Sequence, residues 1–426
     1  MSSESPVPFE KLRLDNGVVV ILHQDRRLPT ACVNLWYHVG AKDEPAGRSG
    51  FAHLFEHLMF MGTRRAPQGD FDRIMEGAGG QNNATTSEDR TNYFSWGPST
   101  LLPTLLWLEA DRLEDLGAAM TQEKLDLQRD VVRNERRQSY ENEPYGNAEL
   151  EVNGLMFAET HPYHLPVIGS HADLEAATVD DVREFFATYY VPNNLSIAIA
   201  GDFDRDATLD LVSGLFGTLP RGAEPLRRDA APARLGGPIR RTVRDPAVEF
   251  ARTSLIWHSP ALFAAGDAEC DVMAKILGDG ISSRLQRRLM VDELLVQSAG
   301  AWQQSMQLGS LFRIDAVADE GVELARIEAA VDETIRAFLQ DGPTAHELER
   351  VKAQSESEHV ASLQRLLERA DRLNLYDAHF GDPDGFDRDV GRYRRVSRES
   401  VMNRAAAVLD PNARLTLHVL PEEEVA

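Results

Sequence analysis

The chain alternates short apolar runs at strand spacing with longer segments whose apolar residues recur every three or four positions. Strands are predicted at residues 18–22, 31–37, 195–200 and 415–420. A helix with an N-cap and early acidic residues is expected to begin at Thr178-Val-Asp-Asp181. A capping box formed by Thr344 and Glu347 is expected to open a second helix. The second of these helices is expected to run toward Arg372. The mixture predicts an α/β (α+β) fold with mostly antiparallel sheets packed with helices.

The pattern of the first half recurs in the second. Residues 33–38 and 253–258 share leucine, aromatic and histidine positions at a displacement of 220, and residues 190–199 and 409–418 share a Pro-Asn turn before a strand at a displacement of 219. The agreement of the two displacements predicts two tandem homologous domains. Residues 221–238 are rich in Pro, Gly and Ala without periodicity, which is typical of a linker. We therefore expect a first domain at 1–220 and a second at 239–426.

One predicted helix carries three ionisable residues in an apolar run. His53 and His57 are four positions apart, so they lie one above the other on a helix and can bind one divalent ion, with Glu56 beside them. This His-x-x-Glu-His spacing reverses the common metalloprotease order. The alternative is two core histidines and a partly exposed glutamate. Burying such a cluster is costly unless its members find partners or a metal, which favours a metal site.

The internal repeat tests whether the fold itself requires this cluster. Adding 220 to the three positions gives Met273, Ile276 and Leu277, which are all apolar. The second half is therefore expected to contain an apolar helix at the corresponding place. We infer that only the N-terminal half carries chemistry.

A catalytic zinc site needs a third protein ligand. On a helix over residues 125–137, Glu135 shares the apolar face with Leu125, Gln128 and Val132, which makes it the best candidate. The alternative is an irregular amphipathic helix on which Glu135 is exposed. His161 and His164, in a proline-containing loop, form a weaker alternative metal pair.

Composition narrows the classes of partner and compartment. The formal net charge of −23 opposes nucleic-acid binding, and no apolar run reaches the roughly 18 residues of a membrane span. The N-terminus lacks a basic stretch followed by an apolar core, so we expect a cytoplasmic protein, with the periplasm as the alternative if a signal peptide has been removed. Cys32 and Cys270 are too few for a disulfide framework, which favours a reducing compartment.

The chain resembles the pitrilysin/insulinase family of inverted-motif zinc peptidases, specifically its short bacterial branch that is similar to mitochondrial processing peptidase. The segments that carry the resemblance are 14–20, 50–63, 83–86, 89–93, 131–135 and 190–193. The resemblance implies two similar α/β domains with metal only in the first, and one Zn²⁺ per chain. It implies His53, His57 and Glu135 as ligands, with Glu135 78 residues after His57, and Glu56 as the general base. Gln128 departs from the family, which often has an acid at that position.

The resemblance also implies how substrate binds. Asn83, Ala84 and Thr85 match the family's edge strand, onto which an extended peptide adds by backbone pairing. The expected function is a zinc-dependent endopeptidase acting on peptides or short unfolded segments. The alternative is a non-catalytic subunit of an assembly or processing complex that uses the metal structurally.

Self-sufficient relatives carry an Arg and, seven residues later, a Tyr in the second domain, after a Gly-x-x-Ser-Arg-Leu segment. In this chain the two positions fall on Met290 and Gln297, neither of which replaces a cation or a phenol. Arg287 or Arg288 replaces the missing cation only if the helix register slips. We therefore expect a heterodimer with a homologous subunit that carries the Arg/Tyr pair, the two enclosing a chamber. Alone, the chain is expected to bind zinc, to cleave poorly and at most to form a homodimer.

Overall fold

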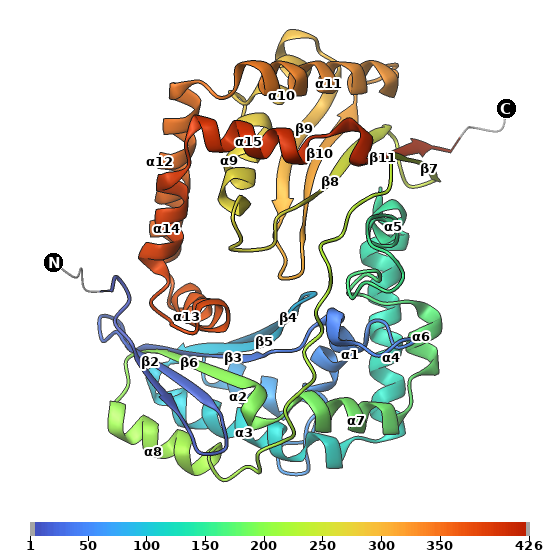
Figure 1. Cartoon of the computed structure of the whole chain (residues 1–426). Helices are drawn as coiled ribbons and strands as arrows, with labels where there is room; N and C mark the ends of the chain where they lie inside the picture. Colours follow the sequence, from blue (N-terminus) through green and yellow to red (C-terminus); the bar gives the residue numbers. More distant parts are fainter. Residues whose placement is uncertain (1–4, 423–426) are drawn as a thin grey trace. The chain divides into compact units, whose positions relative to one another are not determined.

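The computed structural model describes residues 5–422, which form two mixed sheets packed with helices (Figure 1). The first sheet has the order β1-β2-β6-β3-β5-β4, and the second has the order β7-β11-β8-β10-β9. The strands of the first sheet are β1 (Glu10–Arg13), β2 (Val19–Gln24), β3 (Thr30–Tyr37), β4 (Gln81–Thr86), β5 (Thr91–Pro98) and β6 (Leu195–Gly201). Those of the second are β7 (Ile239–Asp245), β8 (Arg252–Ser259), β9 (Val296–Gln304), β10 (Ser310–Ala318) and β11 (Arg414–Pro421).

The two sheets repeat one topology. In the first, β2 and β6 are parallel, and β3 lies antiparallel between β6 and β5. In the second, β7 and β11 are parallel, and β8 lies antiparallel between β11 and β10. The strands that the sequence pairs at displacements of 220 and 219, β3 with β8 and β6 with β11, occupy equivalent places. The predicted fold of two homologous domains with mostly antiparallel sheets is confirmed.

The chain divides into two compact units. The first comprises Met1–Asn134, Leu165–Arg228 and His359–Arg388, and the second comprises Glu135–His164, Asp229–Glu358 and Asp389–Ala426. Each half of the sequence therefore supplies its own sheet and also one segment to the unit of the other half. Residues 221–237 contain no helix or strand, as expected of a linker. The sequence boundaries at 220 and 239 stay a prediction.

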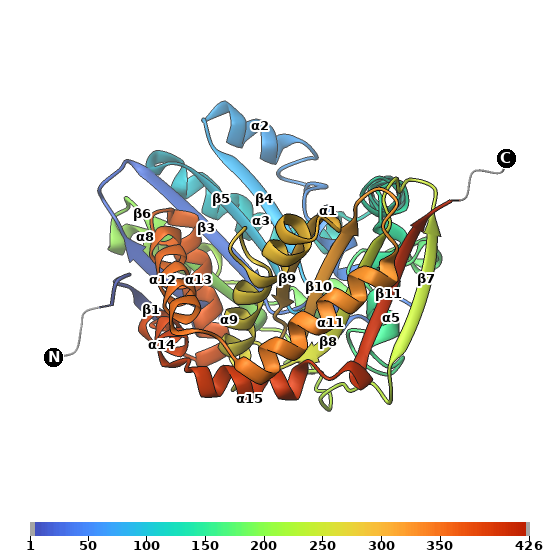
Figure 2. The ribbon, with the colours of Figure 1, turned by 90° about the horizontal axis from the view of Figure 1, so that it is seen from above.

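In the first unit, helices cover both faces of the sheet. α3 (Leu102–Ala119) contacts β3 and β5 on one face, where Arg112 lies 4.4 Å from the ring centroid of Tyr93. α13 (Leu366–Phe380) contacts β3, β6 and β2 on the opposite face. β4 forms the outer edge, and α2 (Asp70–Gly77) contacts it (Figure 2).

Several buried polar contacts attach α13 to its sheet, beside its buried residues Ala370, Leu373 and Tyr376. The carboxylate of Asp371 accepts hydrogen bonds from Asn34 Nδ2 at 3.0 Å and Trp36 Nε1 at 2.8 Å. Arg369, which is 6% exposed, donates to Asp25 at 2.6 Å, and Asn374 donates to the Asn34 carbonyl at 3.0 Å. These donors and acceptors are partly or fully buried. Removing the helix would leave its hydrogen-bond partners on the sheet unsatisfied, which costs free energy.

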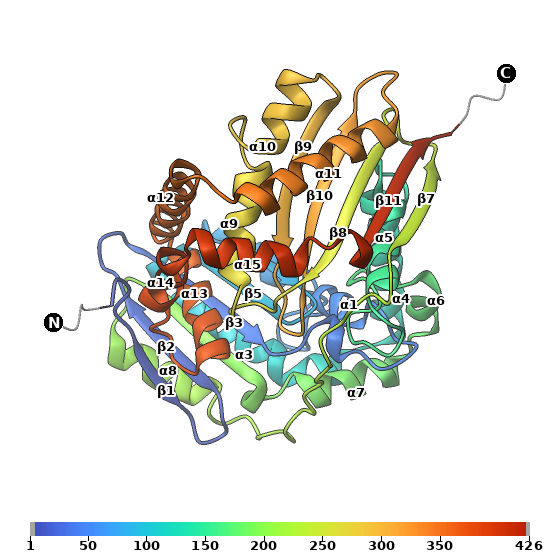
Figure 3. The ribbon, with the colours of Figure 1, turned by 45° about the horizontal axis from the view of Figure 1, so that its top comes forward.

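In the second unit, alternate residues of β8 belong to two cores. Leu255 and Trp257 pack with α9 (Asp267–Gly278), α11 (Leu324–Asp341) and α15 (Arg398–Val408). Ile256 points to the other face, where α5 (Gly146–Met156) contacts β7 and β11 (Figure 3). The two-residue period of a strand explains this division.

The single long helix predicted from Thr344 to Arg372 is wrong. The capping box is present, because the Glu347 carboxylate accepts from the Thr344 amide at 2.7 Å, but α12 (Ala345–Ser362) ends before α13 starts at Leu366. Between the two helices the amides of Leu363, Gln364 and Arg365 each bond to the carbonyl three residues earlier, and no Gly or Pro signals these turns. The break lets α13 make the contacts with Asp25 and Asn34 described above.

The remaining elements connect these layers. They are α1 (Phe51–Leu58), α4 (Gln122–Arg136), α6 (His171–Ala176), α7 (Val179–Tyr189), α8 (Arg205–Leu215), α10 (Arg284–Gln286) and α14 (Phe386–Arg395). Within residues 5–422, none of the helices combines the length and apolar composition needed to cross a lipid bilayer. Cys32 and Cys270 are buried free thiols, and burial raises the pKa of Cys32 to about 12.

Candidate metal centre

α1 places its apolar and ionisable residues on different faces. Phe51, Ala52, Leu54, Phe55 and Leu58 are buried, whereas His53, Glu56 and His57 are half-buried. The Phe55 ring lies 4.7 Å from that of Tyr190 and 5.1 Å from that of Phe185, so the apolar face rests on an aromatic cluster at α7. The ionisable residues are thereby held at the edge of the core.

The start of α1 is fixed by a glycine and a buried carboxylate. Gly50 has a φ of 83°, and a Cβ there would lie 2.8 Å from the Ile168 carbonyl oxygen. Glu44 accepts from the amides of Gly50 at 3.0 Å and Ala52 at 2.8 Å, which satisfies two donors at the helix N-terminus. Burial raises the pKa of Glu44, an effect that these two hydrogen bonds oppose.

Replacing Gly50 with alanine is expected to lower the free energy of unfolding by about 1–3 kcal/mol, because left-handed backbone and a close carbonyl both oppose a Cβ. Chemical denaturation of the purified variant measures the change. Gly77→Ala is the matched control, since Gly77 lies in α2 with open space around its Cβ direction. Equal stability of the two variants would contradict the role given to Gly50.

His53, His57 and Glu135 converge on one point. Each offers a ligand atom, and these atoms all lie within 4.8 Å of one another. The two imidazole rings are 4.8 Å apart at 84°, so they meet edge to face. Two imidazoles and a carboxylate match the donor set of a catalytic zinc, whose bonds of about 2.0–2.2 Å bring such donors together. The residues therefore fit the metal.

α4 carries Glu135 in its last turn. Leu125 and Val132 are its buried residues, and Gln128 and Glu135 are half-buried on the same side. Lys124 Nζ donates to the Gly62 carbonyl at 2.9 Å, and Gln128 Nε2 lies 2.8 Å from Met61 Sδ. Both contacts join α4 to the segment that follows α1. They therefore fix the position of α4 along the helix that carries the two histidines. Gln128 thus has a structural contact at the position where the family often has an acid.

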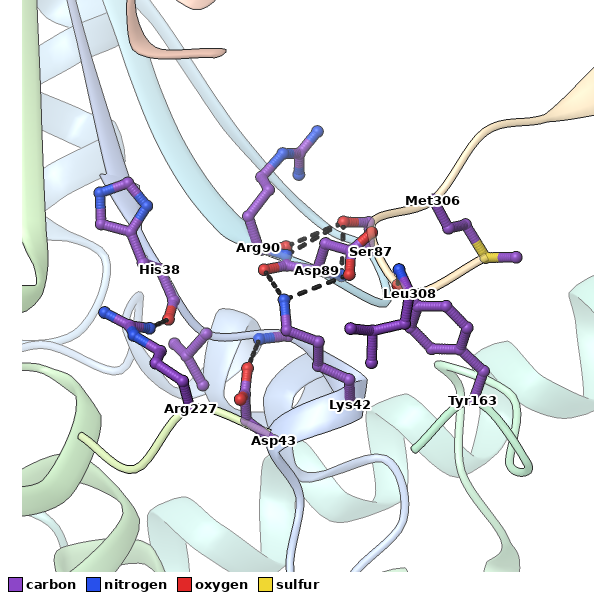
Figure 4. A network of polar contacts seen from close by, with 12 residues as sticks. His38, Lys42, Asp43, Ser87, Asp89, Arg90, Tyr163, Arg227, Met306 and Leu308 are labelled. Atoms are coloured by element: carbon purple, nitrogen blue, oxygen red, sulfur yellow. Dashed lines mark hydrogen bonds and ion pairs between the residues drawn. The ribbon is translucent and has the colours of Figure 1, made fainter. Parts of the chain in front are cut away.

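Glu56 is oriented by the end of the edge strand. The hydroxyl of Thr86, the last residue of β4, donates to Glu56 Oε2. The turn after Thr86 is itself fastened, because Lys42 Nζ donates to the Asp89 carbonyl at 3.0 Å and to its carboxylate at 3.2 Å (Figure 4). Lys42 is 6% exposed, and the Lys42 amide also bonds to the Glu88 carbonyl. These contacts fix the turn that follows Thr86 and so help to hold the Glu56 carboxylate in place.

Asn83, Ala84 and Thr85 lie in the middle of β4, which pairs only with β5 among the strands of residues 5–422. Asn83 and Thr85 are exposed, Ala84 is buried, and the opposite edge of the strand is not paired within the described sheet. Arg90 donates to the Thr85 carbonyl at 2.9 Å and lies 5.4 Å from the Trp36 ring. The strand offers backbone groups along which an extended peptide can pair.

Sequence reasoning gave no role to Thr86, Lys42 or Arg90. Thr86 and Arg90 lie in segments that carry the family resemblance, whereas Lys42 lies outside them. The Thr86–Glu56 and Lys42–Asp89 contacts join residues 30 and 47 positions apart, which no local pattern reveals. The contact of Glu44 with the start of α1 could have been predicted from the sequence. An acidic residue shortly before the glycine that opens an apolar helix is a typical N-terminal signal.

In the second half, the positions equivalent to His53, Glu56 and His57 are apolar. Met273, Ile276 and Leu277 in α9 are fully buried, as the repeat predicts. Met290 packs against the apolar core, and Gln297 is exposed on β9. Residues Arg287–Asp292 form a π-helical turn, in which Arg288 is paired with Glu293 and Glu333, each at 2.6 Å.

His161 and His164 are not part of a three-residue metal cluster in residues 5–422. His164 Nδ1 is 2.9 Å from the Phe157 carbonyl oxygen, and the His161 ring stacks on Phe157 at 4.6 Å. Local packing accounts for both residues.

The repeated fold and the three converging side chains are the features expected of the inverted-motif family, and comparison with family models agrees. Insulinase (Peptidase family M16) matches residues 19–161, and the Peptidase M16 inactive domain matches residues 176–355. The chain belongs to this family, the pitrilysin/insulinase peptidases.

Individual relatives span most of the chain. It is 27% identical to the zinc protease PqqE of Helicobacter pylori over 85% of the chain and 82% of that protein. It is 24% identical to the mitochondrial-processing peptidase subunit beta of Lentinula edodes over 84% of the chain and 78% of that subunit. A crystal structure of a protease from Helicobacter pylori superposes with a TM-score of 0.88 at 25% identity, covering 97% of this chain and 100% of the other. The family supports a function of the zinc-protease type.

Proposed function

We propose that the chain is a zinc-dependent endopeptidase that hydrolyses peptides or short unfolded segments. The observation that carries the proposal is the convergence of His53, His57 and Glu135 beside Glu56, all four from the first half of the sequence. A metal held only for structure needs no carboxylate beside its ligands, whereas hydrolysis needs a group that accepts a proton.

Each part of the site has its own role in the proposed reaction. Zinc, when bound, supplies a Lewis acid that polarises the scissile carbonyl and acidifies water. Glu56 accepts the proton of the attacking water and returns it to the leaving amine. Thr86, by its hydrogen bond to Oε2, positions that carboxylate for the transfer. β4 aligns the substrate by backbone pairing, which suits a broad range of sequences.

Digestion of a peptide library tests the proposal. The purified chain, with and without its homologous partner, is expected to release fragments that mass spectrometry identifies. A chelator is expected to stop cleavage, and Zn²⁺ added afterwards to restore it, because the proposed ligands hold the metal reversibly. Cleavage that survives complete removal of the metal would refute the metallopeptidase proposal.

We also propose that the active form is a heterodimer. Met290 and Gln297 stand where self-sufficient relatives have Arg and Tyr, so a homologous subunit must supply those two side chains. Mixing the chain with a subunit that carries the pair but lacks the His-x-x-Glu-His motif is expected to raise turnover about 100-fold, the typical effect of donors that stabilise the transition state.

Steady-state kinetics of the mixture, of each subunit alone, and of a mixture whose partner has the Arg replaced by Ala measure the effect. The Arg-to-Ala partner is expected to restore little activity although it still assembles. Turnover by the lone chain equal to that of the mixture would show that no partner is needed.

A further inference from the structure

The first unit contains a cavity that is not lined by His53, His57 or Glu135. It has a volume of about 850 Å³ and lies between the segment that leads into β3 and the junction of α12 with α13. Its apolar walls are made chiefly by Leu28, Trp96, Val360, Leu363, Leu366 and Leu367. The volume falls within the range of ordinary ligand pockets, about 300–1,000 Å³.

The walls are apolar and open to solvent, while the charges at the rim are paired. Leu28 is 65% exposed and Val360 is 58% exposed, which is unusual for large apolar side chains that line one concavity. Asp25 pairs with Arg27 and Arg369, each at 2.6 Å, and Arg365 pairs with Glu368 at 3.0 Å. Because the rim cations already have carboxylate partners, the cavity favours an uncharged apolar group over an anionic ligand.

Two aromatic rings of β5, the partner strand of the edge strand β4, lead toward the cavity. Trp96, in its wall, is the register partner of Gln81 at the start of β4, and Phe94 is the partner of Asn83. The two rings stack with centroids 6.2 Å apart at 18°. Register partners share a face of a sheet, so the rings form an apolar track from the middle of β4 to the cavity.

We propose that this cavity binds an apolar side chain of the peptide substrate, far along the chain from the bond that is cleaved. This inference rests on the proposed peptidase function. Glu56 contacts the Thr86 end of β4, whereas Trp96 in the cavity wall is the register partner of Gln81 at the other end of β4. At about 3.3 Å per residue, and about 4.8 Å for each strand crossed, the cavity lies roughly eight residues from the cleaved bond. The chain would therefore select long peptides with an apolar residue at that distance.

Photo-crosslinking locates the peptide without requiring turnover. Zinc-loaded Glu56→Gln protein is mixed with peptides that carry benzoylphenylalanine either near the cleaved bond or about eight residues away, on one side or the other. The distant probe on one side is expected to crosslink to segment 27–31 or 360–367, and the near probe to residues around β4.

The second measurement is the steady-state kinetics of variants at exposed residues of the cavity wall. Leu28→Glu and Val360→Glu change exposed wall residues, so folding should be preserved, and Leu226→Glu is the matched control because Leu226 is 83% exposed and outside the cavity. The two wall variants are expected to raise KM about tenfold for a long peptide with a distant phenylalanine, the loss of one buried apolar contact. A short peptide that ends before the cavity should keep its KM and kcat.

The outcomes separate this inference from the function on which it rests. Crosslinks confined to β4, or equal KM in wall and control variants, would overturn the distant subsite and leave the peptidase proposal intact. Crosslinks of the distant probe together with an unchanged KM for short peptides would support it. Failure of the wild-type protein, with its partner, to cleave any peptide would instead refute the proposed function, and the subsite would fall with it.

Discussion

Replacing Glu56 with glutamine is expected to reduce kcat by about 10²–10⁴-fold while zinc content stays unchanged. The amide cannot accept a proton from water, and general acid–base catalysis contributes a factor of this size. Glu56 is not one of the three converging residues proposed as ligands, so the metal should still bind. Initial rates with a quenched-fluorescence peptide and elemental analysis of the same sample measure both quantities.

Glu76→Gln is the control for this substitution, because Glu76 is an exposed acid on the neighbouring helix α2. It should retain full activity. A Glu56→Gln protein that cleaves as fast as the wild type would remove Glu56 from the reaction. Wild-type protein that binds zinc but shows no cleavage beside its partner would favour the non-catalytic assembly subunit.

Replacing Glu135 with glutamine is expected to weaken zinc binding at least about 100-fold, beyond the 10–100-fold effect of losing a group that only orients a ligand. A neutral amide is a poor substitute for an anionic oxygen donor, and two imidazoles alone leave the site short of a ligand. Competition with a chelating dye measures the affinity.

The control is Glu123→Gln, which changes an exposed acid in the first turn of the same helix. Circular dichroism should show both variants folded, since the buried contacts of α4 come from Leu125 and Val132. Unchanged zinc affinity in Glu135→Gln would exclude Glu135 as a ligand.

The sequence predicts best what depends on near neighbours. Strand positions follow from alternation, and the two histidines need only one helix to bring them together. The duplicated topology follows from echoes between the halves. The position of Glu135 is harder to predict, because this residue lies near His57 in space but 78 positions after it in the sequence. Spacing alone does not decide whether Glu135 is a ligand or an exposed acid.

Other features depend on packing that no local pattern encodes. The break between α12 and α13 follows from contacts of Arg369 and Asp371 with strands more than 330 residues earlier. The apolar cavity joins three separated segments around residues 28, 96 and 363. The local pattern around each of these residues indicates only the element to which that residue belongs.

The exchange of helices between the halves has a consequence for dissecting the gene. A fragment that stops at residue 220 contains His53, Glu56, His57 and Glu135 but lacks α13. Its sheet would present Asn34, Trp36 and Asp25 to water without the helix that satisfies them. The other fragment would lack α5 over β7 and β11. Protease cleavage in the linker should thus leave two pieces that stay associated and copurify, whereas the same pieces expressed separately should be insoluble until combined.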